Sequence, residues 1–366
     1  MCAAIAGSLQ PAAAGSAQAL LALRTLLLLG ALTLRGSHAR VLGFHLDDER
    51  CTSDSRFGNR STLEPICQSV LTEYSHWVGN LSGTGLVLSV DTGACVAPTC
   101  FNITWNGVTK PGHEHVIDTV NESVVMDYID TAAGAVSYSG RGAAWLLAYA
   151  STFTPARPVR LGLAIREPGA PSTWWQADNI TAMDALMAGV LPLAAPFASF
   201  DGLAVFHSAL WRASALAGPP SSTGNPGRGP HARRLAGWYV PPEAIFNGSS
   251  QQLGFLHWAQ ATNITLLYAQ NFIGDPAVIP GVSNNTEAFC EFVQMSHRAG
   301  IDVHIFGALP SLQRDLVFIS SCQMPARGPL PPTPPAPSPC QLAITESCGS
   351  AQAASQVSRL PPNHTR

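Results

Sequence analysis

The stretch VLGFHLDDER, residues 41–50, sets a pattern that returns along the chain: a short apolar run ends in charged residues. Residues 41–46 are a short, continuous apolar run of the kind found in strands buried on both faces. A helix-length amphipathic segment follows at about 62–79. This succession is typical of a parallel strand whose connection returns through a helix.

The alternation continues on both sides of one break. Strands are expected at 86–90, 124–126, 159–165 and 203–206 and, after the break, at 238–240, 264–268 and 301–306, with further helices at about 140–151, 181–193, 249–261 and 285–299. Five strands followed by three make eight, which predicts an α/β fold of the (β/α)8 TIM-barrel type. A doubly wound sheet is the alternative, but no glycine-rich phosphate turn follows the first strand.

Composition shifts divide the chain into five segments. We expect a signal peptide at 1–39, a five-strand barrel segment at 40–211, a linker at 212–236, a three-strand segment at 237–322 and a disordered Pro-rich tail at 323–366. Ser37 and Ala39 suit a cleavage site before Arg40, and a signal anchor is the alternative. The later part of the chain contains no run of the roughly 20 apolar residues that a membrane span needs.

Asparagine usage indicates passage through the secretory pathway. Nine of the thirteen asparagines head an Asn-x-Ser/Thr triplet, namely Asn59, Asn80, Asn102, Asn121, Asn179, Asn247, Asn263, Asn284 and Asn363. A random asparagine meets that rule about one time in ten. We therefore expect a secreted, extracellular glycoprotein.

Cysteine usage agrees with this compartment. Cleavage of the leader removes Cys2 and leaves eight cysteines, an even number that suits oxidised pairs. The close pairs Cys51/Cys67, Cys95/Cys100 and Cys340/Cys348 are the expected disulfides. Zinc is the weaker alternative, because no C-x-x-C pair occurs.

Charge excludes some partners. The net charge is −3 and Lys110 is the single lysine, so the chain lacks the basic surface of a nucleic-acid-binding protein.

No cofactor motif occurs. Asp47-Asp48-Glu49 contains oxygen ligands for Ca²⁺ or Mg²⁺, but successive strand residues alternate faces, so Asp48 should point away from its neighbours. His113 and His115 are placed in a loop, and we expect no metal site.

Four motifs carry a resemblance to a known group of proteins. The segments GFHLDDER (43–50), VVMDYIDTAAGAV (124–136), RLGLAIREPG (160–169) and FDGLAVFHSALW (200–211) resemble secreted (β/α)8-barrel proteins similar to glycoside hydrolases. In that loosely characterised family these blocks belong to strands four, six, seven and eight, and residues 237–310 resemble strands one to three. The halves therefore stand in swapped order. A circular permutant and a fragment of a tandem-barrel protein both explain it.

The resemblance implies a two-carboxylate site at the carboxyl ends of the strands. Glu49 would be the general acid/base and Glu167 the nucleophile of a retaining glycosidase. The like charge of Asp47 would raise the pKa of Glu49. Further polar and aromatic residues would bind a carbohydrate substrate, namely Asp91, Asp127, Tyr128, His207, Trp174 and Trp175.

This chain also departs from the family pattern. Arg50 stands where proline is usual, Arg166 precedes Glu167, Ile129 replaces an arginine, and His207 is single where the family has a doublet. Either arginine could pair with a neighbouring acid and keep it ionised. A non-catalytic carbohydrate-binding or structural glycoprotein is therefore the alternative function, and an incomplete barrel that does not fold stably is the third.

Overall fold

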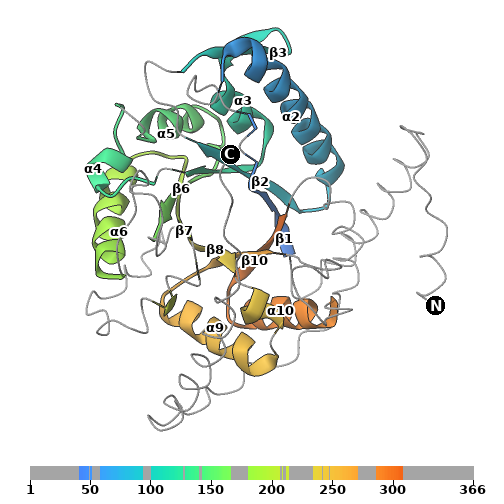
Figure 1. Ribbon diagram of the computed structural model, residues 1–366, viewed down its shortest axis with the longest axis vertical. Coiled ribbons are helices and arrows are strands. Elements are labelled where there is room, and N and C mark those ends of the chain that lie inside the picture. Colours follow the sequence, from blue (N-terminus) through green and yellow to red (C-terminus); the bar gives the residue numbers. More distant parts are fainter. Residues whose placement is uncertain are drawn as a thin grey trace, which may run out of the picture. The chain divides into compact units, whose positions relative to one another are not determined.

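The computed structural model describes residues 41–48, 50–51, 58–93, 100–126, 128–139, 142–165, 180–206, 208, 212–213, 234–240, 242–246, 248–270 and 286–307. All of these residues belong to one compact unit, residues 1–330. Its parallel strands close into a barrel in the order β1-β10-β9-β8-β7-β6-β5-β2 (Figure 1). The predicted TIM-type barrel is confirmed.

Every expected strand contributes to this barrel. The strands are β1 (Val41–Leu46), β2 (Val87–Gly93), β5 (Glu122–Met126), β6 (Val159–Ala164), β7 (Phe200–Phe206), β8 (Arg234–Val240), β9 (Leu266–Gln270) and β10 (Asp302–Gly307). Because β1 pairs with β10, the two sequence segments complete one barrel. β8 begins inside the predicted linker, since Leu235 and Ala236 pair with Leu203 and Ala204 of β7.

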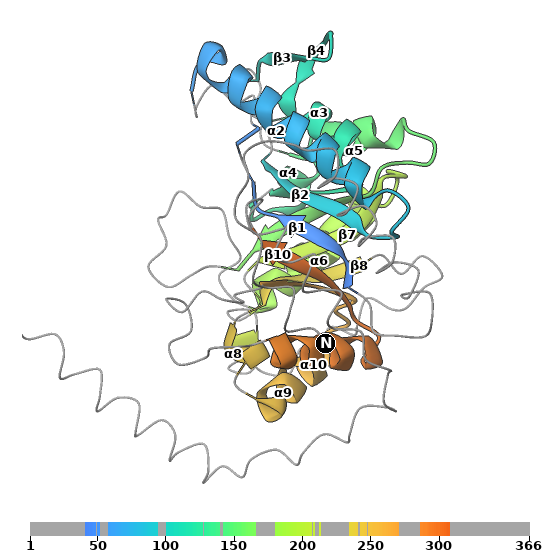
Figure 2. The same cartoon turned by 90° about the vertical axis from the view of Figure 1, so that its right-hand side faces the viewer.

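Helices cover the outside of the barrel (Figures 1 and 2). They are α2 (Arg60–Leu81), α3 (Gly112–Thr119), α4 (Ala132–Ala135), α5 (Ala144–Ser151), α6 (Ile180–Ala194), α8 (Pro242–Phe246), α9 (Ser249–Ala261) and α10 (Thr286–Arg298). Four of the five predicted helices match within two residues, whereas the helix expected at 140–151 begins at Ala144 and follows the short α4. No helix in the described part of the chain is long and apolar enough to cross a membrane.

Strand alternation divides the buried side chains into two layers. Phe44 and Leu46 of β1 belong to the large core between the strands and the helices. His45, between these two in the sequence, points to the opposite side of the strand, into the barrel interior. It is completely buried and stacks on Tyr268 of β9. Apolar and aromatic side chains of the second cluster, including Met126 and Phe306, fill the barrel interior around this pair. The interior is therefore a packed core, as in other barrels of this type.

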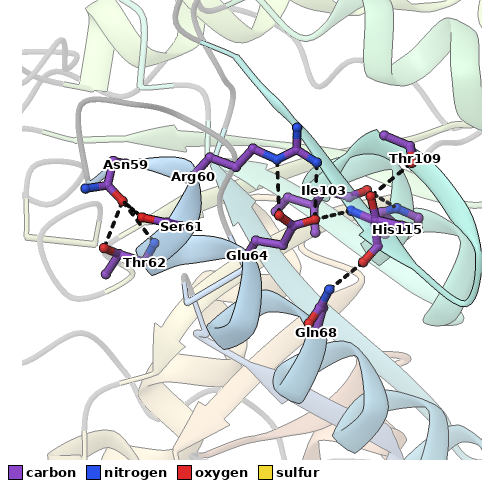
Figure 3. Close-up of polar contacts among 10 residues, drawn as sticks. Asn59, Arg60, Ser61, Thr62, Glu64, Gln68, Ile103, Thr109 and His115 are labelled. Atoms are coloured by element: carbon purple, nitrogen blue, oxygen red, sulfur yellow. Dashed lines mark hydrogen bonds and ion pairs between the residues drawn. The ribbon is translucent and has the colours of Figure 1, made fainter.

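A β-hairpin is inserted between β2 and α3, where only a connection was expected. Its strands β3 (Asn102–Trp105) and β4 (Val108–Pro111) pair antiparallel. Two side chains of α2 bind the outer edge of β3 (Figure 3): Glu64 Oε1 accepts from the Thr104 N–H at 2.7 Å, and Gln68 Nε2 donates to the Thr104 carbonyl at 2.6 Å. The helix thus satisfies backbone groups that an edge strand leaves open.

The Cys51–Cys67 disulfide joins the segment after β1 to α2, as predicted. Cys100 and Cys290 are also disulfide-bonded. The proposed partner of Cys100, Cys95, and the pair Cys340/Cys348 lie outside the described residues.

Candidate functional site

The candidate site is the barrel mouth formed by the carboxyl ends of the strands. Three predicted site residues are described there: Asp47 follows β1, Asp91 lies near the end of β2, and Tyr128 follows β5. These strands are neighbours in the barrel. The other six predicted residues lie outside the described residues, namely Glu49, Asp127, Glu167, Trp174, Trp175 and His207.

Asp47 and Asp48 point to different environments. Asp47 is exposed at the end of β1, and desolvation together with the charge of Asp48 raises its pKa. The Asp48 side chain is only 9% exposed and accepts two hydrogen bonds from the Arg50 guanidinium, at 2.7 and 2.6 Å. Its backbone carbonyl accepts from the Tyr74 hydroxyl of α2 at 3.3 Å. Asp48 thus turns away from the barrel axis, as strand alternation predicted.

This arrangement also places one of the two unusual arginines. Arg50 binds Asp48 in a bidentate pair and approaches Glu73 of α2 at 3.4 Å. Bidentate pairing holds a guanidinium in a fixed orientation. Arg50 is therefore engaged on the helix side of β1. Arg166, the second departure, lies outside the described residues.

Asp91 belongs to a buried polar group below the mouth. Its Oδ1 lies 3.1 Å from His45 Nε2, and His45 Nδ1 lies 3.0 Å from the Ser89 hydroxyl. Burial, followed by the charges of His304 and Arg160, holds the pKa of His45 well below its ordinary value. A neutral imidazole in this position shares a hydrogen bond with the Ser89 hydroxyl through Nδ1, while its Nε2 faces the Asp91 carboxylate.

The residue types of this group match a serine–histidine–aspartate set, but its position does not suit nucleophilic catalysis. His45 and Ser89 are 0% exposed and Asp91 is 1% exposed. A nucleophile must reach a reacting atom of the substrate. The Ser89 hydroxyl, sealed in the barrel core, is therefore a packing and hydrogen-bonding group.

A second buried polar group continues toward the opposite end of the barrel. The Tyr268 ring stacks on His45 with centroids 3.8 Å apart, and its hydroxyl accepts from Arg160 Nη1 at 2.9 Å. Arg160 is completely buried and pairs with Glu122 and Asp201. Burial alone would lower the arginine pKa, but these partners raise it. The cation therefore stays charged in the barrel interior.

An irregularity in β7 brings one of these partners inside. Val159 pairs with Phe200 whereas Arg160 pairs with Gly202, so Asp201 is an extra residue in β7. Gly202 has a φ of 133°, a conformation that glycine adopts readily. The bulge turns the Asp201 carboxylate toward Arg160.

The top of the interior is aromatic on one side. The rings of Tyr128 and Phe206, the last residue of β7, lie 6.3 Å apart at an angle of 29°. Both side chains are half-buried and pack against the interior cluster. Phe206 was absent from the predicted site. Its position as the last inward residue of an expected strand could have indicated it.

The buried polar residues were also missed. His45, Ser89 and Arg160 each interrupt an apolar strand. A polar residue between two apolar ones on a barrel strand indicates an inward position with a partner. That signal is present in the sequence, but the identity of each partner is not.

The histidine pair at 113 and 115 is helical, which corrects its predicted placement in a loop. Both residues lie in α3 and are buried. His115 Nε2 lies 3.0 Å from the Ile103 carbonyl of the hairpin. Among the described residues no group of three or more His, Cys, Asp or Glu could hold a metal ion.

Comparison with known proteins does not indicate a reaction or a substrate for this chain. No protein-family model and no curated protein matches the chain. Among solved structures, the HMG-CoA lyase of Bacillus subtilis is 13% identical with a TM-score of 0.36, covering 90% of this chain and 91% of that one. The catalytic domain of a β-amylase from Paenibacillus polymyxa is 9% identical with a TM-score of 0.30, covering 86% and 97%. At these scores neither likeness carries an argument about function.

Proposed function

We propose that the chain is a secreted carbohydrate-active barrel that hydrolyses a polysaccharide by a retaining mechanism. Glu49 acts as general acid/base and Glu167 as nucleophile. The acid protonates the leaving oxygen while the nucleophile attacks the anomeric carbon, and water then releases the sugar from the enzyme.

Strand order is the observation that carries the proposal. Glu49 follows the last residue of β1, Leu46, by three positions, and Glu167 follows the last residue of β6, Ala164, by three positions. In the closed barrel β1 and β6 are separated by β2 and β5. The carboxyl ends of both strands therefore lie at the same end of the barrel, which supports a site that uses both glutamates.

The surroundings of β1 support the assigned roles. Asp47 has a raised pKa two residues before Glu49, so this side of the mouth already disfavours additional negative charge. Asp48 binds the Arg50 guanidinium, and this pairing leaves that cation engaged beside α2. Both features favour a carboxyl group that holds its proton until the leaving oxygen takes it.

Hydrolysis assays of two variants test the proposal. Purified chain secreted from a eukaryotic host is incubated with mixed-linkage β-glucan, xylan, glucomannan and glycol chitin, and new reducing ends are measured. Loss of general acid catalysis in Glu49→Gln should lower the rate about 10²- to 10⁴-fold. Glu167→Gly should lose turnover, and azide should restore cleavage because the anion attacks the anomeric carbon in place of the missing carboxylate while the leaving oxygen is protonated by Glu49. The product is then a glycosyl azide, which has no reducing end, so this cleavage is detected by mass spectrometry of the products.

Glu291→Gln is the matched control, because Glu291 lies exposed in the middle of α10. Full activity in Glu49→Gln and Glu167→Gly would refute the assignment. Binding of a polysaccharide without turnover by the unmodified chain would instead indicate the non-catalytic glycoprotein. In a structure of the complex, carboxyl groups about 5–5.5 Å apart would support retention, and a clearly wider separation would contradict it.

A further inference from the structure

The described residues pack the barrel interior below the mouth. Completely buried His45 and Tyr268 stack on each other, and Phe306 packs over His45 with ring centroids 5.7 Å apart. Phe306 is 7% exposed and Met126 is 6% exposed. A bound molecule must therefore lie across the top of this layer.

The top layer has an aromatic side. Tyr128 follows β5 and Phe206 ends β7, and these two strands flank β6. The inward residues of β6 between them are small: Gly162 pairs with Met126, and Ala164 pairs with Phe206. Small residues on the middle strand let the two rings meet across it. The result is a half-buried pair of stacked aromatic rings, which we call the Tyr128–Phe206 platform.

The opposite side of the mouth is polar. In the closed strand order β7 is four positions from β1, so Phe206 lies across the barrel from Asp47. Asp47 is exposed there, whereas Asp91 on the neighbouring β2 is buried against His45. The mouth therefore combines an apolar surface with an exposed hydrogen-bond acceptor, the Asp47 carboxylate. A pyranose ring has the same division, with C–H groups on its faces and hydroxyls around its edge.

The charges of residues at the mouth indicate whether a bound sugar is neutral or charged. The exposed residue at this side, Asp47, is acidic, and the nearby cation Arg50 is held by Asp48 on the helix side of β1. The described part of the mouth therefore repels an anionic sugar. A uronic acid would bring a carboxylate toward Asp47.

We infer that the Tyr128–Phe206 platform is the stacking surface for an uncharged pyranose ring, with Phe206 as the specificity-determining residue that the sequence did not reveal. The inference rests on the proposed function of the mouth as a saccharide site. The ring face lies on the aromatic side chains and its hydroxyls face Asp47 at the end of β1. Stacking on aromatic rings rewards apolar ring faces and gives no reward to a charge.

Binding to a hydrolysis-deficient chain tests the inference without interference from turnover. In the Glu167→Gln background, affinities are measured by calorimetry for cellohexaose, mannohexaose, xylohexaose, chitohexaose and, as the charged probe, hexagalacturonate. Phe206→Leu keeps apolar volume but removes the flat face, and should weaken the best neutral probe roughly tenfold. Tyr128→Leu should act in the same direction, and Tyr128→Phe, which keeps the ring, should lose less.

Tyr138→Leu is the matched control, because Tyr138 is an exposed aromatic residue (70%) that packs near Phe197. Thermal unfolding of each variant shows whether it is folded. Saturation-transfer NMR gives a second readout: axial C–H protons of one sugar face should receive magnetisation from the platform, and Phe206→Leu should abolish this pattern.

The outcomes separate the inference from the proposed function. Unchanged neutral-sugar binding in Phe206→Leu and Tyr128→Leu would overturn the platform even if the enzyme hydrolyses polysaccharide. Platform-dependent binding without hydrolysis by the unmodified chain would overturn the catalytic proposal and support the platform. Tighter binding of hexagalacturonate than of every neutral probe would overturn the sugar class, and no binding of any probe would overturn the platform together with the proposed function.

Discussion

At the scale of single residues, the interior of this barrel depends on polar side chains that have specific partners. His45 joins Ser89, Asp91 and the Tyr268 ring, and Tyr268 joins this group to the buried Arg160. Burial raises the pKa of Tyr268 to about 12, so the phenol keeps its proton at ordinary pH.

We predict that acid destabilises the fold through His45. The folded-state pKa of His45 lies well below its ordinary value of 6.5. As pH falls below about 6.5, the unfolded chain binds this proton and the folded chain does not. The stabilising contribution is therefore complete above that pH and decreases toward the lowered folded-state pKa, by at most about 1.4 kcal/mol per pH unit.

The measurement is denaturant unfolding between pH 7.5 and 5. His45→Gln should be less stable at pH 7.5, because its partners lose part of their hydrogen bonding, but its stability should decline less steeply with acid. His76→Gln is the matched control, since His76 is exposed on α2. An equally steep decline in His45→Gln and in the parent would contradict the assignment.

At the scale of elements, close packing of neighbouring strands fixes where the chain needs glycine. A Cβ on Gly43 of β1 would meet the Val87 carbonyl oxygen at 2.2 Å and Val87 Cγ2 at 2.7 Å, both on β2. Gly93, at the end of the same β2, has open space at the equivalent position. Close packing therefore requires glycine at position 43, whereas a larger side chain has room at position 93.

We predict that Gly43→Ala separates β1 from β2 and costs roughly 1–3 kcal/mol of unfolding free energy. The clash is with backbone, which cannot rotate away as a side chain would. Gly93→Ala should change stability little. Chemical denaturation of both variants measures the two unfolding free energies. Equal stability of the two variants would show that β1 and β2 pack less closely than the structure shows.

The hairpin of β3 and β4 is an element that was not predicted, although its turn has a recognisable sequence. Asn106-Gly107 forms its turn, and both residues have positive φ, 50° and 77°. Asn-Gly between two short β-prone runs is a strong hairpin signal, but the expectation of a plain barrel connection between 86–90 and 124–126 left no place for it. Its docking, through Glu64 and Gln68 of α2, involves residues about 40 positions away and is not a local property.

At the scale of the whole molecule, closure joins segments that are distant in sequence. β1 pairs with β10, and β7 pairs with β8 across the segment that the sequence marks as a linker. Either strand group alone would present two unpaired edges of a buried parallel sheet. Open edges of this kind favour association rather than a stable monomer.

We predict that residues 40–213 and 234–322, produced separately, each fail to unfold cooperatively. Co-production should restore a one-to-one complex, because β1–β10 and β7–β8 pairing can then form. Size-exclusion chromatography and circular dichroism of the separate and combined fragments provide the measurement. A monomeric larger fragment with a sharp unfolding transition would show that closure is not required.

The sequence by itself determined the succession of strands and helices, the eight-stranded barrel, the Cys51–Cys67 pair and the outward direction of Asp48. These are consequences of local periodicity and short separation along the chain, which residue types specify directly. Only the tertiary structure decided that His45 meets Asp91, that Arg160 meets Tyr268, and that Phe206 joins Tyr128 at the mouth. Those contacts depend on which strands are neighbours, on their register and on the bulge at Asp201, and a one-residue shift in register would change every one of them.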